Sequence, residues 1–134
     1  MELMALARLC GLTEADLIRF LPAPERRIAK WLTGEAAPSN GALEVMRGLH
    51  ERQQAAADGL IAAWLDAGRP GSVDFAVGAD DESAGKMGWP SPGAQMAVAA
   101  IAQVEIAPSR VIARPVSVTG GRPEPVDPAA IAAE

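Results

Sequence analysis

The sequence predicts a mainly helical protein with a small α+β part at its C-terminal end. Up to residue 67, apolar side chains recur at helical spacing between clear turn signals. Beyond residue 70, two alternating stretches rich in β-branched residues flank an alanine-rich stretch. A chain of 134 residues suits one compact domain or two very small ones. We therefore expect a helical unit over 1–67, a strand-helix-strand unit over 70–118 and a flexible tail over 119–134.

The N-terminal quarter of the chain is expected to form three short helices. The first occupies the opening ten residues and closes at Gly11. Thr13 is a good N-cap for the second, which ends near Phe20. A turn with two prolines follows, and Pro24 is expected at the first position of a third helix that ends near Gly34, because a proline loses no hydrogen bond there.

The fourth helical stretch is much longer. Ser39 or Asn40 offers the N-cap, and no proline interrupts the chain until after Ala67. Gly48 and Gly59 weaken the pattern, so one long helix or two are both compatible with it.

The C-terminal unit is predicted to consist of a strand, a loop, a helix and a second strand. Residues 72–78 alternate and predict a strand, and 79–88 predict a polar loop. Residues 91–106 begin with Ser-Pro-Gly and continue as an alanine-rich helix, and 110–118 predict a second strand. Pro115 predicts that this second strand is an edge strand or a broken one, because proline cannot donate to a ladder.

Positive charge is local in this sequence, although the net charge is −5. Residues 53–134 carry all of the net negative charge, whereas residues 19–30 hold four cations and one acid. At 100° per residue, the third helix turns Ile28 and Trp31 towards a core and presents cations on the opposite face.

Three short helices, with a tight turn before the third, basic helix and a fourth helix behind them, form the framework of a helix-turn-helix DNA-binding domain. Long side chains at the start of such a helix reach base edges and phosphates in the major groove. The residues expected to read bases are Glu25, Arg26 and Ala29. The residues expected to contact phosphates are Arg27, Lys30, Thr33 and Arg19.

A spaced pattern over residues 6–49 supports this interpretation. It consists of Leu6, Gly11-Leu12-Thr13, Leu17, Ile28, Trp31, Gly34, Pro38 and Ser39. In this spacing the chain resembles the Cro/repressor (Xre-type) helix-turn-helix family, which implies a lambda-repressor-like bundle that binds double-stranded DNA. The departures are Glu14 where the family often has a phosphate-contacting glutamine, Ile18 for a small alanine, and Pro22 for the turn glycine.

The remaining elements, with Gly88-Trp89 just before the alanine-rich helix, resemble the anti-CRISPR-associated (Aca-type) and YdiL-like autorepressors. This resemblance implies a phage-associated homodimeric repressor whose C-terminal unit pairs two subunits. A dimer would read half-sites about 34 Å apart in a pseudo-palindromic operator. The residues expected at the dimer contact are Trp89, Met96, Val98 and Ile101.

Other functions find little support in the residues. Cys10 is the only cysteine and is expected to be a buried, inert thiol, and His50 has no catalytic partner in view. The acidic run 80–82 lacks the alternation of a calcium loop. We expect no enzyme, cofactor, metal or small-molecule ligand. No segment of the sequence predicts a signal peptide or a membrane span, so a cytoplasmic protein is expected.

One alternative stays open. The net acidity and Glu14 favour a protein-binding module, such as an antitoxin or adaptor, that keeps the helix-turn-helix fold but uses it for a protein partner.

Overall fold

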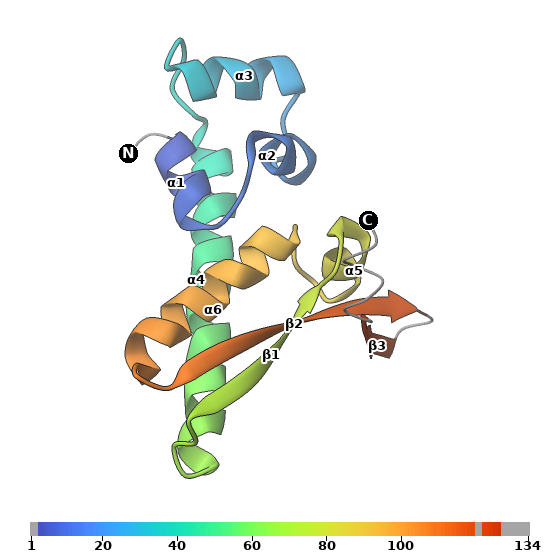
Figure 1. Ribbon diagram of the computed structural model, residues 1–134. Coiled ribbons are helices and arrows are strands. Elements are labelled where there is room, and N and C mark those ends of the chain that lie inside the picture. Colours follow the sequence, from blue (N-terminus) through green and yellow to red (C-terminus); the bar gives the residue numbers. More distant parts are fainter. Residues whose placement is uncertain (1–2, 120–121, 127–134) are drawn as a thin grey trace.

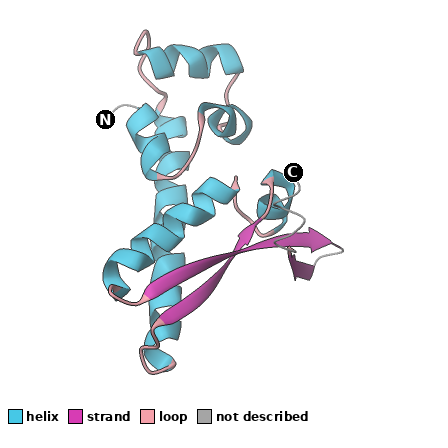
Figure 2. Ribbon diagram, in the orientation of Figure 1, coloured by secondary structure: helices cyan, strands magenta, loops and turns pink. Residues whose placement is uncertain are grey.

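The computed structural model describes residues 3–119 and 122–126, which form a mainly helical structure with a small mixed sheet (Figures 1 and 2). The mainly α fold with a small α+β part is therefore confirmed. No helix in the described ranges is long and apolar enough to cross a membrane. The elements are α1 (Leu3–Leu9), α2 (Glu14–Phe20), α3 (Glu25–Thr33), α4 (Asn40–Asp66), β1 (Ser72–Gly78), α5 (Asp81–Lys86), α6 (Pro92–Ile106), β2 (Arg110–Thr119) and β3 (Arg122–Pro125).

Helix α4 connects the two ends of the structure. It is one helix of 27 residues, about 40 Å long. The side chain of Ser39 caps it by accepting a hydrogen bond from the Ala42 N–H at 3.1 Å. The N-terminal half of α4 packs with α1, α2 and α3, and the C-terminal half packs with α6 and the sheet. Of the two predicted possibilities, one long helix is correct.

Gly48 and Gly59 lie in the interior of α4, where a glycine weakens a helix. A Cβ atom at either position would meet no neighbouring atom within 4 Å. We expect Gly48→Ala and Gly59→Ala each to raise the free energy of unfolding by about 0.5–1 kcal/mol, because alanine loses less backbone entropy. Urea denaturation of the two variants and the wild type tests this expectation. Any loss of stability would mean that these positions are less open than they are here.

The N-terminal helices enclose one apolar cluster. Its largest fully buried side chains come from each of the four helices: Leu3, Leu17, Ile28, Met46 and Leu49. The predicted cap of α2 is present as a full capping box. The Thr13 hydroxyl accepts from the Asp16 N–H, and the Asp16 carboxylate accepts from the Thr13 N–H.

The sheet has the order β1-β2-β3, and α6 lies in the crossover between its parallel strands (Figure 2). Val73 and Phe75 in β1 register with Val111 and Ala113 in β2, and Phe75 and Val111 pack on the cluster formed by α4 and α6. The opposite face is covered at one end by α5. There a Cβ atom on Gly78 would lie 2.4 Å from the Ala84 nitrogen, so only glycine permits this approach.

Two predictions for the C-terminal unit were wrong. The polar stretch 79–88, with its acidic run, contains α5. It forms because Asp80 caps it through the Ser83 N–H at 2.7 Å, and because Ala84 is buried against the sheet. The tail predicted over 119–134 contains β3. Residues 120–121 and 127–134 of that prediction lie outside the described residues.

Strand β3 was not predicted because two of its four residues, Pro123 and Pro125, are prolines. The Val126 N–H donates to the Pro115 carbonyl, so residue 126 faces β2. By alternation, the ring nitrogens of Pro123 and Pro125 face the open edge, where no ladder hydrogen bond is lost.

Strand β2 tolerates Pro115 for a related reason. The Val116 carbonyl accepts from the Ala79 N–H on the β1 side, so Pro115 faces the other side. There the Val126 N–H donates to the Pro115 carbonyl just beyond the last registered pair, Val116 and Pro125, so the donor that proline lacks is missing only at the end of the β2–β3 ladder. The strand is therefore unbroken, and its first half is an edge, as Pro115 predicted.

The helical part and the α+β part meet at a close backbone contact. A Cβ atom on Gly11 would lie 2.1 Å from the Gly93 carbonyl oxygen, and one on Gly93 would lie 2.2 Å from the Gly11 oxygen. Beside this contact, the fully buried Gln53 amide donates to the carbonyls of Cys10 at 2.8 Å and Ala94 at 3.1 Å. These bonds hold α4 against both the α1–α2 corner and the first turn of α6.

Candidate nucleic-acid interface

Helix α3 lies at one end of the molecule, with one face on the core and the other in solvent (Figure 1). Ile28 and Trp31 are buried in the N-terminal cluster, as predicted. The outward residues are Glu25, Arg26, Arg27, Ala29, Lys30 and Thr33, all of them exposed. The predicted base-reading set therefore shares one accessible surface with Arg27, Lys30 and Thr33.

The turn before α3 works without glycine. Leu21 has φ −77° and ψ 138°, and Pro24 has φ −61° and ψ 143°. No residue from 21 to 24 has a positive φ. Pro22 can therefore replace the glycine of the resembled family, because the backbone here needs no left-handed conformation.

Pro24 is the N-cap of α3 rather than its first helical residue, one position from the prediction. A proline side chain has no acceptor, so it makes no cap hydrogen bond. The Arg27 N–H donates to the Pro24 carbonyl at 3.0 Å, whereas the N–H groups of Glu25 and Arg26 receive no acceptor from the cap, at the positive end of the helix dipole.

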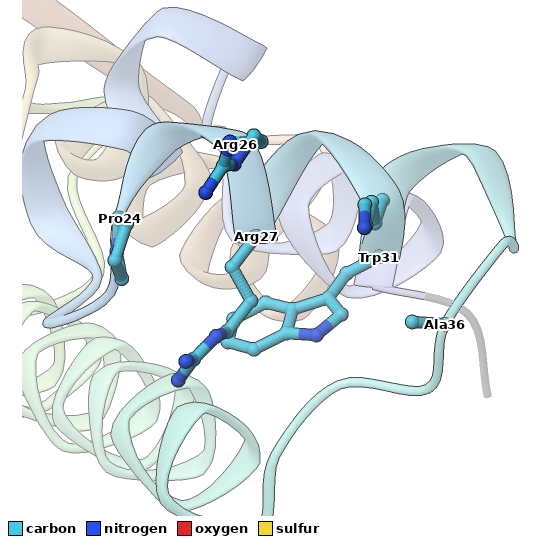
Figure 3. A pocket seen from close by; sticks show the side chains of 6 residues that line it. Pro24, Arg26, Arg27, Trp31 and Ala36 are labelled. Carbon is cyan, nitrogen blue, oxygen red and sulfur yellow. The ribbon is translucent and has the colours of Figure 1, made fainter.

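A shallow depression of about 420 Å³ lies on the surface of α3 (Figure 3). Arg26 projects from the outer side of the helix, while the Arg27 side chain runs beside the Trp31 ring. The lining residues are Pro24, Arg26, Arg27, Lys30, Trp31 and Ala36. None of these three cations forms an ion pair with any carboxylate in the described ranges. The depression is thus suited to anions.

Ala36 lies at this surface although it was not predicted there. The Ala36 N–H donates to the Lys30 carbonyl at 3.2 Å, so the chain folds back against α3 after the left-handed Gly34. The helix-ending glycine was the only available signal for this return.

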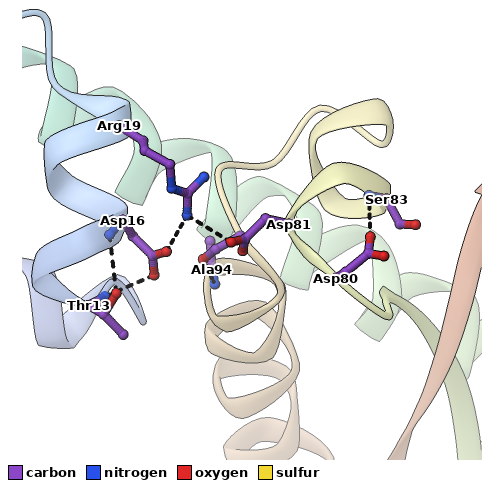
Figure 4. Close-up of polar contacts among 8 residues, drawn as sticks. Thr13, Asp16, Arg19, Asp80, Asp81, Ser83 and Ala94 are labelled. Atoms are coloured by element: carbon purple, nitrogen blue, oxygen red, sulfur yellow. Dashed lines mark hydrogen bonds and ion pairs between the residues drawn. The ribbon is translucent and has the colours of Figure 1, made fainter. Parts of the chain in front are cut away.

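Arg19, which was expected to contact phosphate, is already engaged with acids. Its guanidinium pairs with the carboxylates of Asp16 and, at 3.2 Å, Asp81 (Figure 4). The side chain therefore links α2 to α5, and two carboxylates offset its charge. Arg19 is therefore less suited to a phosphate contact than predicted.

Thr33 is also less suited to phosphate than predicted. Its hydroxyl donates to the Lys30 carbonyl at 3.2 Å, within the last turn of α3. A hydroxyl has one proton to donate, so only acceptor lone pairs remain, and a phosphate needs donors.

The four residues expected at a dimer contact lie in different environments. Met96 is 47% exposed and Ile101 is half-buried against α4. Trp89 packs against both apolar clusters, and the Arg52 guanidinium lies 4.6 Å from its ring centre. Val98 is 0% exposed in the core, so it has no surface to offer a second copy. The prediction for Val98 is corrected for that reason.

Other reactive groups have structural roles in this fold. Cys10 is buried, and burial raises the pKa of its thiol, which keeps it protonated and a poor nucleophile. The pKa of Asp80 is lowered because its carboxylate accepts hydrogen bonds from Ser83 at the start of α5. Across the described residues, no group of three or more His, Cys, Asp or Glu side chains could hold a metal ion.

Neither any family model nor any curated protein matches this chain. The resemblances to the Cro/repressor family and to the anti-CRISPR-associated autorepressors therefore stay predictions. The placement and charge of α3 are the features of the described residues that bear on function.

Proposed function

We propose that this protein is a sequence-specific DNA-binding regulator that reads the major groove with α3. In this proposal α2, the turn 21–24 and α3 act as a helix-turn-helix. One observation carries it: Arg26, Arg27 and Lys30 project together from a helix whose other face is held in the core, and no described carboxylate pairs with them. Such a cationic surface on a chain of net charge −5 is suited to a polyanion.

The exposed residues of α3 fall into two groups, those placed to contact base edges and those placed to contact phosphates. Arg26 lies in the first turn of α3, the part of a recognition helix that enters the groove, and can bond a guanine edge with two donors. Glu25 can accept from a cytosine amino group, and Ala29 can contact a thymine methyl. Arg27, Lys30 and the uncapped N–H groups of α3 would bind phosphates.

A homodimeric repressor fits these residues best. One α3 offers too few base contacts for useful specificity, whereas two on a two-fold axis would read half-sites about 34 Å apart. A pseudo-palindromic operator follows from that symmetry. Bound at a promoter, such a dimer would repress by occlusion.

The salt dependence of binding tests the proposal. We expect wild-type protein at ~50–100 mM salt to prefer duplex from upstream of its own gene over random duplex. Lys30→Ala should weaken binding to all sequences and make the negative slope of log K against log salt less steep by about 0.9 per subunit, or about 1.8 for the bound dimer. Arg26→Ala should instead cost about 1–3 kcal/mol per half-site on the preferred duplex and relax specificity at one position of each half-site.

Arg110→Ala is the matched control, because Arg110 is an exposed cation at the start of β2, away from α3 (Figure 1). Its slope and affinity should equal those of the wild type. A wild-type protein without preference for its upstream DNA, or a Lys30→Ala slope equal to the wild-type slope, contradicts the proposal.

An antitoxin or adaptor is the second candidate. Glu14 is exposed at the start of α2, where the resembled family often carries a phosphate-contacting glutamine, and a carboxylate there would repel phosphate. An acidic segment of a protein partner would suit the same depression on α3. In that case the chain binds its partner in a salt-dependent way that Arg26→Ala weakens, and duplex DNA does not compete.

A further inference from the structure

Strand β2 has one side that no other described strand covers over its first half. The Arg110 N–H donates to the Gly71 carbonyl, so the backbone groups of even-numbered residues in β2 face β1. Those of Ser109, Val111 and Ala113 therefore face the other side, where β3 pairs only with the second half of β2. A row of free N–H and C=O groups at a sheet edge is a template on which another strand can add.

The side-chain amide of Gln103 in α6 occupies the start of this edge. Its Oε1 accepts from the Val111 N–H and its Nε2 donates to the Ser109 carbonyl, both at 2.8 Å. A strand added here would need the same donor and the same acceptor. A primary amide carries an acceptor oxygen and a donor NH2 group on one carbon, so it can replace the peptide groups of such a strand.

The far end of the same edge is closed as well. The Val126 N–H donates to the Pro115 carbonyl, and Pro115 has no N–H to offer. Between the two closed ends, only the Val111 carbonyl and the N–H and carbonyl of Ala113 lack a hydrogen-bond partner among the described residues. This gap is too short for strand pairing, since strands in sheets are usually at least ~3 residues long.

Other side chains close the remaining ends of the β1–β2 pair. The Gly78 N–H faces away from β2, and the Oε1 of the buried Gln95 accepts from it at 2.7 Å. Where β2 extends beyond β1, Val118 meets α5: its N–H donates to the Ser83 hydroxyl oxygen at 3.2 Å, and its carbonyl accepts from the Lys86 ammonium at 3.3 Å. Side chains of both α5 and α6 thus bond to the strand edges of the described sheet (Figure 2).

We propose that Gln103 is an edge-protecting residue, whose amide closes β2 to strand addition by other copies of this chain. This inference goes beyond the proposed function and does not depend on it. Without Gln103, a continuous open row would run from Ser109 to Ala113. Val111 and Ile112 within that row are β-branched and favour strand pairing.

An apolar hollow makes this edge a stronger template than a bare backbone. It has a volume of about 190 Å³ and lies between α6 and β2, beside the open row. Its lining residues are Met96, Ala99, Ala100, Gln103, Val111 and Ala113. A strand that adds to an edge gains affinity when such a hollow takes one of its side chains. Protection by Gln103 therefore matters most at this edge.

Hydrogen exchange in the wild-type protein measures the protection directly. After correction for intrinsic rates, the Val111 amide should exchange roughly 3–10-fold more slowly than the Ala113 amide, because only the Val111 amide has an acceptor among the described residues. Gln103→Met keeps the side-chain length but removes both hydrogen bonds, so the two amides should then exchange at similar rates. Equal rates in the wild type overturn the inference.

Self-association tests the consequence of an open edge. At about 100 µM protein, where exposed strand edges aggregate, Gln103→Met should form aggregates that bind thioflavin T, and the wild type should form none. Gln54→Met is the matched control. Gln54 is exposed on α4, so the same substitution there opens no edge, and the variant should behave like the wild type.

Gln103→Glu separates edge protection from a loss of stability. Its carboxylate still accepts from the Val111 N–H but cannot donate to the Ser109 carbonyl, and it places a charge on the edge, which opposes strand pairing. Gln103→Glu should therefore form no aggregates, although both variants should unfold at lower urea concentration than the wild type. Ala113→Pro, added to Gln103→Met, should also suppress aggregation, because it removes a free N–H from the edge and restores no lost contact.

Only one pattern supports the edge-protecting role: Gln103→Met aggregates, and the wild type, Gln54→Met, Gln103→Glu and the double variant do not. Gln103→Met without aggregates overturns the inference. Equal aggregation of Gln54→Met or Gln103→Glu also overturns it, because added apolar surface or lost stability would then be the cause. If Gln103→Met does not fold, the exchange rates of Val111 and Ala113 in the wild type decide. None of these measurements involves DNA, so the proposed function can fail without affecting them.

Discussion

Replacing both Arg26 and Lys30 by glutamate should lower the affinity for the preferred duplex by about 10³-fold. The two side chains are exposed on α3 and have no carboxylate partner among the described residues. Loss of a bidentate base contact removes about 1–3 kcal/mol, and loss of a phosphate contact adds to this. Each glutamate also brings repulsion from the phosphates. Titration of a labelled duplex at fixed salt measures the change.

The control must alter the net charge equally. Arg110→Glu with Arg122→Glu also changes the charge by four units, but these residues lie on β2 and β3. Because the control sites are away from α3, binding should fall by less than about threefold, through long-range repulsion alone. Equal losses in both double variants would show that net charge, rather than the α3 surface, governs binding. Neither pair should shift stability by more than about 0.5 kcal/mol per substitution, since all four side chains are exposed.

Gly11→Ala should be the most destabilising of the single substitutions considered, at about 3–5 kcal/mol. Gly11 has φ +74°, a conformation that costs an alanine roughly 1–2 kcal/mol. In addition, the new Cβ would lie 2.1 Å from the Gly93 oxygen and 2.7 Å from the Gly93 carbon. Backbone atoms cannot rotate away as a side chain would, so the contact between the α1–α2 corner and α6 must open. Urea denaturation at one protein concentration measures the loss.

Comparison with Gly34→Ala separates the steric part of that effect from the conformational part. Gly34 also has a positive φ, +81°, but a Cβ there would meet no neighbouring atom within 4 Å. It should therefore cost only the conformational part, about 1–2 kcal/mol. If Gly11→Ala proved no worse than Gly34→Ala, the close approach of Gly11 to Gly93 would not exist in solution.

Local signals in the sequence predicted most elements correctly. Thr13 and Ser39 were recognised as caps because a hydroxyl before a helical pattern has a direct partner two or three residues on. Ile28 and Trp31 were placed in the core by spacing alone. The candidate site on α3 was found for the same reason, since a short helix with two opposed faces encodes both its burial and its exposed charge.

The errors concern residues whose roles depend on distant partners. Arg19 was predicted to be a cation free to contact phosphate. One of its two partners, Asp81, follows 62 positions later in the sequence (81 − 19 = 62), so sequence spacing does not reveal the pair. Val98 and Val104 are both valines on one alanine-rich helix, yet one is buried and the other exposed. In a helix that is apolar all round, periodicity does not say which face meets the core. Strand β3 was missed because its prolines are tolerated only at an open edge, which the sequence does not mark.

The sequence by itself determined the approximate limits of the described helices other than α5, the two-faced character of α3 and the presence of a small α+β part. These depend on interactions within a few residues: caps, turns and periodic apolar side chains. Only the tertiary structure decided that Gly11 and Gly93 touch, that Gln53 joins three elements, that Arg19 pairs with Asp81 and that Val104 on α6 faces solvent. Each of these depends on segments far apart in the chain, and their contact is set by the packing of the whole fold.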